Sequence, residues 1–395
     1  MKNFYLSIFA SLFLSLSLPA QQWDTLAPIP EPLTFPVTAV VDGRIHIMGG
    51  GGTGGATAAH YAYDPATNTW ETKAPVPYLA QQPAGTAVNG KIHYFGGGYP
   101  NTGTPLKDHY IYDPVSDSWT QAADLTAPRA IHYAVNLDEV LYSLGGQGMA
   151  NLCQTYDAVN DQWITKNPLP DNSFWYGAHV PTGGHIYRFC GGGYTAPVNK
   201  AHKYDPVTDS WSPLPNMPNA IHALRGAAIG DQIFLVGGYF DFLERDEVWI
   251  FDTNTETYST GTPLPIGRAY HNLVALDSCL YVLGGNNAIN ETVRTQLLRL
   301  CPFETPSGVQ ETVLVNSISA TYYGGQLSVQ LPELSSAGTV QLALYDLNGR
   351  QVWLEKLNSG ADGTVETRLP GMAPAVYFLQ VKTEGELFSG KVFVY

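Results

Sequence analysis

The sequence predicts an all-β fold built from six repeats of four short strands, followed by a second, smaller β unit. Three observations support this prediction. A glycine doublet occurs six times, an aromatic residue followed by Asp comes after each of the first five doublets, and a second aromatic residue lies seven positions after the first. The first glycines of successive doublets lie 47, 49, 46, 46 and 47 residues apart. A fixed period of this length is typical of repeat architectures.

The glycine doublet ends the second strand of each repeat, because a short apolar run precedes it every time. Its members are Gly49, Gly50, Gly96, Gly97, Gly145, Gly146, Gly191, Gly192, Gly237, Gly238, Gly284 and Gly285. In the fourth repeat, Cys190 then takes the position that apolar residues such as Met48 and Phe95 hold elsewhere. We therefore interpret Cys190 as a small buried apolar residue.

Aromatic residues on either side of a turn mark the third and fourth strands. The first aromatic, followed by Asp, is Tyr63, Tyr112, Tyr156, Tyr204 or Phe251. The second is Trp70, Trp119, Trp163, Trp211 or Tyr258. Pro, Asp and Asn lie between the two and favour tight turns. Each repeat is thus expected to form four strands of about five residues, joined by hairpins.

The sixth repeat lacks its last strand, and the start of the chain supplies a replacement. Cys301 stands where Asp is expected. In the other repeats a second aromatic lies seven residues after the residue before that Asp, and no Trp lies seven residues after residue 300. Trp23 lies 47 residues before Trp70, in register with the series. We therefore expect the N-terminal strand to complete the sixth repeat and close a ring.

This pattern resembles the kelch repeat, whose hallmark is a glycine doublet followed by a spaced Tyr and Trp on a four-stranded propeller blade. The resemblance covers about residues 23–301 and implies a six-bladed β-propeller over residues 21–301. In such a fold, glycine lets backbones approach closely near the axis. The Tyr and Trp side chains supply the apolar area that neighbouring blades bury against each other.

The start of the chain predicts export. Residues 1–20 combine Lys2 with an apolar stretch from Phe4 to Leu18 and a small residue, Ala20, at which cleavage can occur. This is the pattern of a secretory signal peptide, with a membrane anchor as the less favoured interpretation. No other stretch is long enough to cross a bilayer, so we expect no transmembrane segment.

The end of the chain predicts a separate domain. Residues 302–308 read as a short linker, and about seven short strands over residues 309–395 suggest an immunoglobulin-like β-sandwich, with a hairpin turn at Asn348 and Gly349. Residues 344–350, 369–381 and 391–394 resemble the C-terminal sorting domain of the type IX secretion system. That family usually has Gly where Ala375 stands. The resemblance implies outer-membrane export by a Gram-negative bacterium, with the product secreted or held on the surface. An accessory adhesive sandwich is the alternative.

The net charge limits the partners. The chain carries 20 Lys+Arg and 34 Asp+Glu, a net charge of −14. Residues 307–395 contribute 5 − 8 = −3 and the leader +1, which leaves −12 for the propeller region. An acidic body disfavours nucleic acid and anionic lipid. We expect a monomer that binds a protein or a glycan, in addition to the secretion machinery that residues 309–395 would engage.

Four cysteines are too few for a disulfide framework. Cys279 begins the second strand of the sixth repeat and Cys301 ends the third, so antiparallel pairing would place them side by side and permit a disulfide in an exported protein. No Cys-X-X-Cys or His–Cys cluster suggests zinc, and we expect neither a metal nor a cofactor.

Candidate ligand-binding residues lie where the innermost strand of each repeat would begin. Arg129 and Arg268 both stand sixteen residues before a doublet, at a position that Trp175 is expected to hold in the fourth repeat, and both precede a His by three residues. The full set is Arg129, His132, Trp175, His179, His222, Arg225, Arg268 and His271. In a propeller these strands line the central channel, so the side chains could converge at one mouth and bind carboxylates or sugar hydroxyls. A structural role in the repeat's own hydrogen bonding is the alternative.

The sequence leaves three classes of function open. The first is a binding module for proteins or glycans. The second is an enzyme similar to the exported sialic acid mutarotases, which have six kelch blades. That resemblance implies an acid/base carboxylate, for which the loop of Glu244 is the nearest candidate. It also implies an arginine that binds the sugar carboxylate, for which Arg225 and Arg268 are the nearest candidates. The third is a structural surface protein. A copper enzyme resembling galactose oxidase is disfavoured, because that family has seven blades and no Cys–Tyr–His set can be placed here. We assign no catalytic residue.

Overall fold

The structure is a computed structural model, in which the chain divides into two compact units with the boundary between residues 304 and 305 of the sequence. The described residues are 22–52, 54–100, 102–147, 149–170, 175–193, 196–241, 243–286 and 295–302 of the first unit and 319–323, 326–330, 339–345, 351–359, 364–369, 375–382 and 387–394 of the second. The expected signal peptide, linker residues 303–308 and the turn at Asn348 and Gly349 lie outside them.

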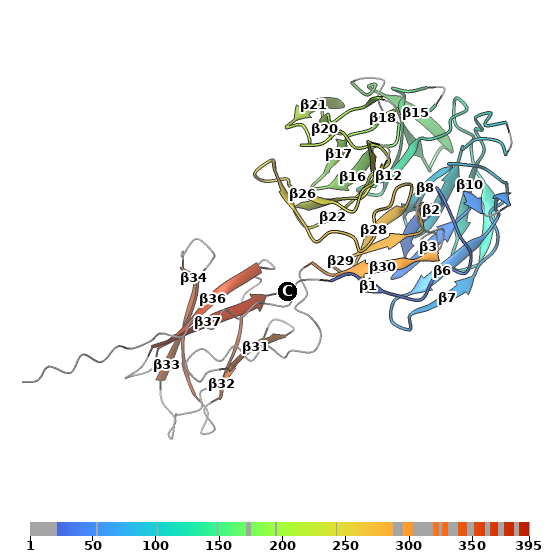
Figure 1. Ribbon diagram of the computed structural model, residues 1–395. Helices are drawn as coiled ribbons and strands as arrows, with labels where there is room; N and C mark the ends of the chain where they lie inside the picture. The colour runs from blue at the N-terminus through green and yellow to red at the C-terminus, as the bar shows by residue number, and fades with distance from the viewer. Residues whose placement is uncertain are drawn as a thin grey trace, which may run out of the picture. The chain divides into compact units, whose positions relative to one another are not determined.

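The first unit contains six four-stranded antiparallel sheets, one for each repeat, arranged as the blades of a propeller (Figure 1). Blade one contains β2 (Val37–Val41), β3 (Arg44–Met48), β6 (His60–Asp64) and β7 (Thr69–Thr72). Blade two contains β8 (Ala84–Val88), β9 (Lys91–Phe95), β10 (His109–Asp113) and β11 (Ser118–Gln121). Blade three contains β12 (Tyr133–Leu137), β13 (Val140–Leu144), β14 (Cys153–Asp157) and β15 (Gln162–Lys166).

The remaining blades repeat this order, and the last takes its fourth strand from the start of the chain. Blade four contains β16 (Ala178–Thr182), β17 (His185–Phe189), β20 (Ala201–Asp205) and β21 (Ser210–Leu214). Blade five contains β22 (Arg225–Ile229), β23 (Gln232–Val236), β26 (Val248–Asp252) and β27 (Thr257–Thr260). Blade six contains β28 (Asn272–Leu276), β29 (Cys279–Leu283), β30 (Leu297–Leu300) and β1 (Asp24–Thr25).

The N-terminal strand closes the ring, as the sequence predicts. Asp24 pairs with Arg299 across β1 and β30, and the Arg299 guanidinium donates to the Asp24 carboxylate at 2.8 Å. Trp23 is only 8% exposed, and its indole N–H donates to the carbonyl of Thr262 at 3.1 Å. Trp23 therefore does for blade six what Trp70 does for blade one, where its indole N–H also donates to a loop carbonyl.

In blades one to three, the Tyr and Trp of the repeat fasten the blade to the loop that enters it. Trp70 Nε1 donates to the carbonyl of Ala27 at 2.9 Å, and the Asn68 side chain accepts from both the Ala27 amide and the Tyr63 hydroxyl. The same arrangement recurs with Tyr112, Asp117, Trp119 and Ala74, and with Tyr156, Asp161, Trp163 and Ala123. The Asn or Asp five residues after the Tyr is thus a third repeat hallmark, which was not predicted from the sequence.

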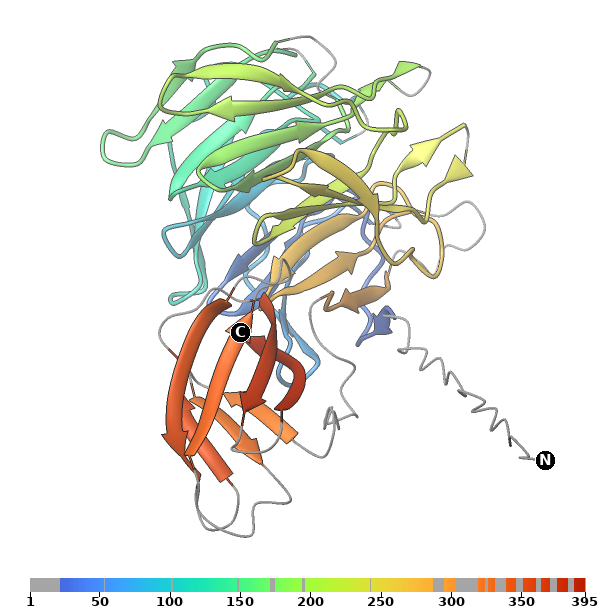
Figure 2. The same cartoon turned by 90° about the vertical axis from the view of Figure 1, so that its left-hand side faces the viewer.

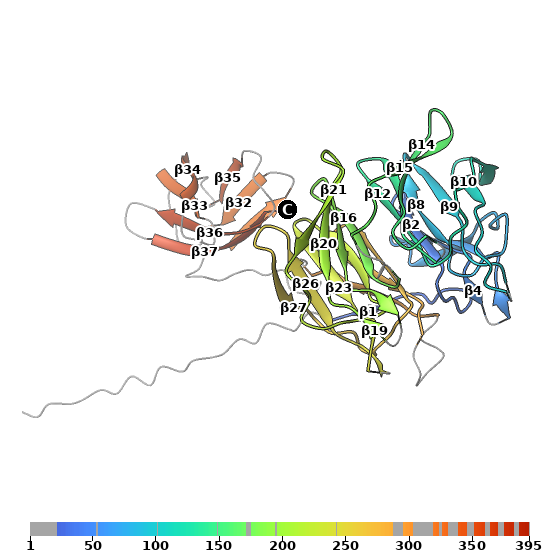
Figure 3. The same ribbon diagram turned by 90° about the horizontal axis from the view of Figure 1, so that it is seen from above.

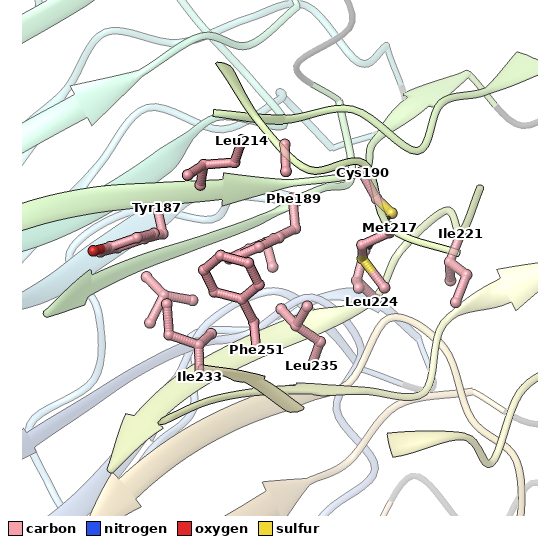
Figure 4. Close-up of a cluster of buried hydrophobic side chains, with 13 residues drawn as sticks. Tyr187, Phe189, Cys190, Leu214, Met217, Ile221, Leu224, Ile233, Leu235 and Phe251 are labelled. Atoms are coloured by element: carbon pink, nitrogen blue, oxygen red, sulfur yellow. Dashed lines mark hydrogen bonds between the residues drawn. The ribbon is translucent and has the colours of Figure 1, made fainter. Parts of the chain in front are cut away.

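Neighbouring blades bury apolar side chains between their faces. Figure 4 shows such a cluster between blades four and five, where Phe189 of β17 meets Phe251 of β26 edge to face with 5.2 Å between ring centroids. Leu235 and Leu224 lie in the same cluster. Each sheet is buried on both faces in this way, which stabilises a repeat that has no core of its own.

The glycine doublet of blade four differs from its prediction. Phe189 pairs with Ala201 as Met48 pairs with His60, so Cys190 holds the first doublet position and Gly191 the second. Cys190 has φ 55°, close to the 60° of Gly49. Placing the doublet at Gly191 and Gly192 was therefore wrong by one residue, because three consecutive glycines hide the register in the sequence. Counted from Cys190, the position sixteen residues earlier is residue 174, outside the described residues, and not Trp175.

The propeller has two distinct faces. The innermost strands β2, β8, β12, β16, β22 and β28 all begin at one end of the channel, which we call the mouth face. Small hairpins extend the loops there: β4 (Gly51–Gly52) with β5 (Gly55–Ala56), β18 (Gly192–Gly193) with β19 (Ala196–Pro197), and β24 (Tyr239–Phe240) with β25 (Leu243–Glu244). Figure 2 shows the yellow β24–β25 pair standing out from its blade, and Figure 3 labels β4 and β19. The opposite end, where the turns within each blade lie, is the hairpin face.

A disulfide joins Cys279, at the start of β29, to Cys301, just after β30, with 4.1 Å between the Cα atoms. It links the two middle strands of blade six, the blade that closes the ring. Cys153 and Cys190 are free thiols buried in the propeller.

The second unit is a two-sheet β structure. One sheet contains β31 (Ser319–Tyr323), β32 (Gln326–Gln330) and β35 (Thr364–Arg368). The other contains β34 (Gln351–Asn358), β33 (Thr339–Tyr345), β36 (Ala375–Lys382) and β37 (Leu387–Val394). Buried Leu327 and Val365 of the first sheet share one core with Leu342 and Leu379 of the second. The described part of the chain includes no helix with the length and apolar character needed to span a bilayer.

Candidate functional site

A ring of six residues with left-handed backbone surrounds the mouth of the channel. Each lies fourteen residues before the first doublet position of its repeat. The members of this mouth ring are Phe35 (φ 50°), Gln82 (54°), Ile131 (56°), Tyr176 (57°), Ala223 (58°) and Tyr270 (57°). None is glycine, and left-handed backbone costs about 1–2 kcal/mol for an L-residue. Strained residues that cluster in this way point to a functional site.

The aromatic members of the mouth ring gather at the axis. The ring centroids of Phe35 and Tyr270 lie 4.7 Å apart, and those of Tyr176 and Tyr270 lie 5.8 Å apart. Gln82 donates to the Tyr176 hydroxyl at 3.0 Å, and His222 Nε2 lies 3.2 Å from the Tyr270 hydroxyl. Hydrogen bonds from blades two and five thus fix the tyrosines that blades four and six supply.

Next to this aromatic cluster, the innermost strands enclose an axial cavity of about 150 Å³. All six blades contribute to its wall. Blades three, four and five supply the large polar side chains Tyr133, His179 and Arg225. Blades one, two and six add Thr38, Gln82 and Asn272. Every blade thus contributes at least one hydrogen-bonding side chain to the wall.

Arg225 is the cation of this cavity, and it pairs with no carboxylate among the described residues. Its Nη1 donates to the carbonyl of Leu224 at 3.2 Å, and its Cζ lies 5.9 Å from the ring centroid of Tyr133. Tyr133 stacks on His179 with 4.1 Å between centroids. Burial holds the pKa of His179 well below its usual value, helped by the positive charges of Arg188 and Arg225, so this imidazole is neutral at pH 7.

No Asp or Glu lines the cavity where the structure describes it. Nor do three or more His, Cys, Asp or Glu side chains gather as a metal-binding group among the described residues. The described wall of the site therefore offers a guanidinium, hydroxyls and aromatic faces, and no carboxylate to accept a proton.

The two Arg-X-X-His arginines serve their own blades. Arg129 and Arg268 are fully buried, and they donate to the side-chain carbonyls of Gln154 at 2.6 Å and Gln296 at 2.8 Å. Each also bonds the carbonyl of the first doublet glycine in its repeat. Burial lowers the pKa of both guanidinium groups to about 10, so both stay charged at pH 7. The structure thus places them inside blades three and six, away from the cavity wall.

The two histidines of the motif pack between glycines. A Cβ on Gly96 would lie 2.5 Å from His132 Cε1, and one on Gly237 would lie 2.9 Å from His271 Cε1. Burial keeps the pKa of both imidazoles well below the usual value. His132 also reaches the cavity wall, whereas His271 stays between blades five and six. Trp175 lies on the mouth face and is 36% exposed.

Of the eight predicted residues, His132, His179 and Arg225 line the cavity and His222 supports the aromatic cluster. Sequence reasoning missed the remaining polar and aromatic wall. These wall residues are Phe35, Thr38, Gln82, Tyr133, Tyr176 and Asn272, and Tyr270 was missed in the neighbouring aromatic cluster. The mouth-ring members among them share a constant spacing from the doublets, which was an available signal, but the sequence does not show that this position has left-handed backbone.

Comparison with known proteins identifies kelch repeats in two parts of the chain. The profile of the KLHDC2/KLHL20/DRC7 Kelch-repeats domain matches residues 9–146, and that of the Kelch motif matches residues 182–218. Kelch-like protein 23 of Homo sapiens is 35% identical over 98 residues, which is 24% of this chain and 18% of the relative. Alpha-scruin of Limulus polyphemus is 27% identical over 200 residues, 45% of this chain and 21% of the relative. The matches thus span about a fifth of these relatives' length.

A solved structure described as "Structure of YjhT" has the same fold, with a TM-score of 0.59 at 17% identity. The superposition covers 69% of this chain and 95% of that chain. Together with the six radial sheets, these matches show that the chain contains kelch repeats and has a β-propeller fold.

Proposed function

We propose that the propeller is a binding module that holds a protein or glycan ligand on its mouth face. The observation that carries this proposal is the placement of the exposed aromatic side chains. Tyr99, Trp175 and Phe240 are 57%, 36% and 37% exposed, and all three lie in loops of the mouth face. Exposed Leu79, Met149 and Leu243 lie in loops of the same face. Aromatic residues and Met are enriched at protein interfaces.

The hairpin face offers a different surface. Its most exposed apolar residues are Val115, Val159 and Val207, each 92% exposed at the tip of a separate turn. Each valine follows an aspartate by two residues, and that aspartate accepts the valine's backbone N–H. Small apolar tips set among carboxylates make a poorer docking surface than exposed aromatic rings.

The geometry favours binding over the ring-opening alternative. Acid/base chemistry on a sugar ring needs a positioned carboxylate, and none lines the described cavity wall. In the blade-five loop, Glu247 forms an ion pair with Arg245 and accepts from Trp249 and Asn219. That carboxylate is committed to holding its own loop.

We further propose that the protein is exported, with residues 1–20 as the signal and residues 309–395 as the sorting domain. The support lies in the sequence patterns at the two ends of the chain. Fractionation of the source bacterium, with mass spectrometry of the mature N-terminus, tests this. Accumulation of the 309–395 deletion in the periplasm supports a sorting role; unchanged surface or medium localisation contradicts it.

Selection from a peptide display library and a glycan array, both with the full chain, tests the binding function. Trp175→Ala and Phe240→Ala should each weaken a selected ligand at least fivefold, because truncated aromatic anchors lose the most binding energy. Val115→Ser and Val207→Ser are matched controls on the hairpin face and should change nothing. Absence of any saturable ligand contradicts a binding module, and sensitivity only to the valine variants places the site on the other face. NMR measurement of faster anomer exchange in N-acetylneuraminate would restore the enzyme alternative.

A further inference from the structure

We propose that the Cys279–Cys301 disulfide is a redox-sensitive latch for the ring. While the bond is intact, it holds the end of β30 and, through β30, the N-terminal strand β1. Its reduction releases these two strands together, and the other blades stay folded. Three observations carry this inference: blade six has no turn at this end, the cysteines occupy positions that form ion pairs in other blades, and β1 pairs with β30 at the edge of the sheet.

In blade six, no turn joins the third strand to the fourth. In blades one to five a short turn makes this connection, and an Asp at the end of the third strand fixes it. Asp64 accepts the Ala66 amide at 2.9 Å, and Asp252 accepts the Asn254 amide at 2.9 Å. After β30, by contrast, the chain passes through Cys301 toward the second unit without turning back into the blade. A strand end without such a turn opens easily unless another link holds it.

The disulfide supplies that link at a position where other blades form ion pairs. Counted along the paired strands, Cys301 stands where Asp64 ends β6 in blade one. Its partner Cys279 begins β29, as Arg44 begins β3. In blade one the guanidinium and the carboxylate lie 3.5 Å apart, and blade two has a Lys–Asp pair at 3.1 Å in the same place. Partly exposed ion pairs contribute little, so the covalent link occurs in the blade that lacks the turn.

The N-terminal strand depends on β30 for its place. β1 contains two residues, and its Asp24 pairs with Arg299, only two positions before Cys301. Further along, the Leu26 amide donates to the carbonyl of Leu297 at 3.0 Å. Opening that starts at Cys301 therefore removes the partners of the N-terminal segment one after the other.

The bond can be attacked from one side. Cys301 is half-buried, whereas Cys279 is 4% exposed. A thiolate of a dithiol reductant attacks the Cys301 sulfur, the S–S bond breaks, and Cys279 leaves as a thiolate that takes up a proton. The second thiol of the reductant then attacks this mixed disulfide and releases Cys301. In total, two electrons and two protons pass to the cysteines from the reductant, which becomes a disulfide.

The latch makes closure of the ring depend on the redox state of the compartment. Disulfides persist in oxidising compartments and are rare where thiol buffers keep cysteines reduced. The chain has four cysteines, and the other two, Cys153 and Cys190, are free and buried. A reductant therefore acts on the ring only at blade six.

Hydrogen exchange of the full chain, measured by mass spectrometry with and without dithiothreitol, tests the proposal. Reduction should speed exchange at least tenfold in residues 24–29 and 295–300, whereas β28, on the inner edge of the same blade, should change less than twofold. Alkylation should detect two additional thiols in the reduced chain. Removal of the reductant and addition of oxidised glutathione should restore slow exchange.

Variants connect the effect to this bond. Cys279→Ser/Cys301→Ser should show the fast exchange without reductant and no further change with it. Cys279→Arg/Cys301→Asp copies the ion pair of blade one and should slow exchange at least threefold relative to the double Ser variant, without sensitivity to reductant. Arg44→Gln breaks the ion pair in blade one, where the turn remains, and should change exchange in β6 and β7 less than twofold. The native chain with reductant keeps the test valid if a cysteine variant does not fold.

Three outcomes would overturn the proposal. Unchanged exchange in residues 24–29 after complete reduction would show that the closing strand does not need the bond. An equal increase in all six blades would show that the bond acts only on the global stability of the propeller. Fast exchange that reoxidation does not reverse would show irreversible damage in place of a switch. None of these outcomes depends on ligand binding by the mouth face, which is tested separately.

Discussion

Two buried histidine pairs make the stability of the propeller depend on pH. In blade one, the His60 Nδ1–H donates to the carbonyl of Ala74, so His60 Nε2 accepts from the His46 Nδ1–H at 2.9 Å. His93 and His109 repeat this arrangement in blade two. Both pairs need neutral imidazoles, and burial lowers the pKa to about 3 for the first and about 4 for the second member of each pair.

The size of the effect follows from the difference between folded and unfolded chains. Below pH 6.5 the unfolded chain binds a proton at each of these histidines, and the folded chain does so only near pH 4 and below. Stability is therefore fully present above pH 6.5 and is lost as the pH falls toward 4. At pH 5 the loss relative to pH 7.5 is about 2 kcal/mol for each imidazole and about 4 kcal/mol for each pair.

Blade five provides the matched replacement, because it holds Phe234 and Val248 at the positions of His46 and His60. The double variant His46→Phe/His60→Val should lose about 4 kcal/mol less than the native chain between pH 7.5 and 5. Denaturant unfolding at both pH values, followed by tryptophan fluorescence, measures this difference. His185→Asn, on the surface, is the control and should not change the pH dependence. Equal pH dependence of the native chain and the double variant would refute the reasoning.

Three further predictions test the blade contacts. Trp119→Phe and Trp163→Phe should each lower the free energy of unfolding by about 1 kcal/mol through a lost hydrogen bond; Trp211→Phe should cost less, because its indole N–H has no partner among the described residues. A similar cost in all three variants would contradict the bonding scheme. Reduction of the Cys279–Cys301 disulfide, or its double Ser variant, should cost about 3 kcal/mol for a separation of 22 residues; unchanged thermal unfolding under reducing conditions would count against it. Gly96→Ala should destabilise more than Gly90→Ala, since both have left-handed backbone but only Gly96 would press a Cβ on His132; equal costs would show that strain alone decides.

The fold was predictable because its signals are local and repeated. The blade number and the closing role of Trp23 follow from spacing alone, and the structure confirms both. The register of blade four was not predictable, because Cys190 stands where glycine is expected and three glycines follow it.

The candidate site was predictable only in part. Arg225 and His179 could be placed near the axis from their repeat position, and they line the cavity. The partners of Arg129 and Arg268 could not be foreseen, because Gln154 lies in β14 and Gln296 just before β30, and the two have no shared repeat position. The left-handed mouth ring was hidden because Phe, Tyr and Ile carry no sequence signal for positive φ.

The closing strand also has a consequence for biogenesis. Asp24 and its partner Arg299 are 275 residues apart, so a chain emerging from a ribosome or a translocon holds its first strand unpaired until the last repeat has appeared. Contacts this distant in sequence slow folding. A chain that crosses a membrane unfolded can therefore pair its first strand only after the crossing is nearly finished. Ring closure is thus a late folding step that requires all six repeats.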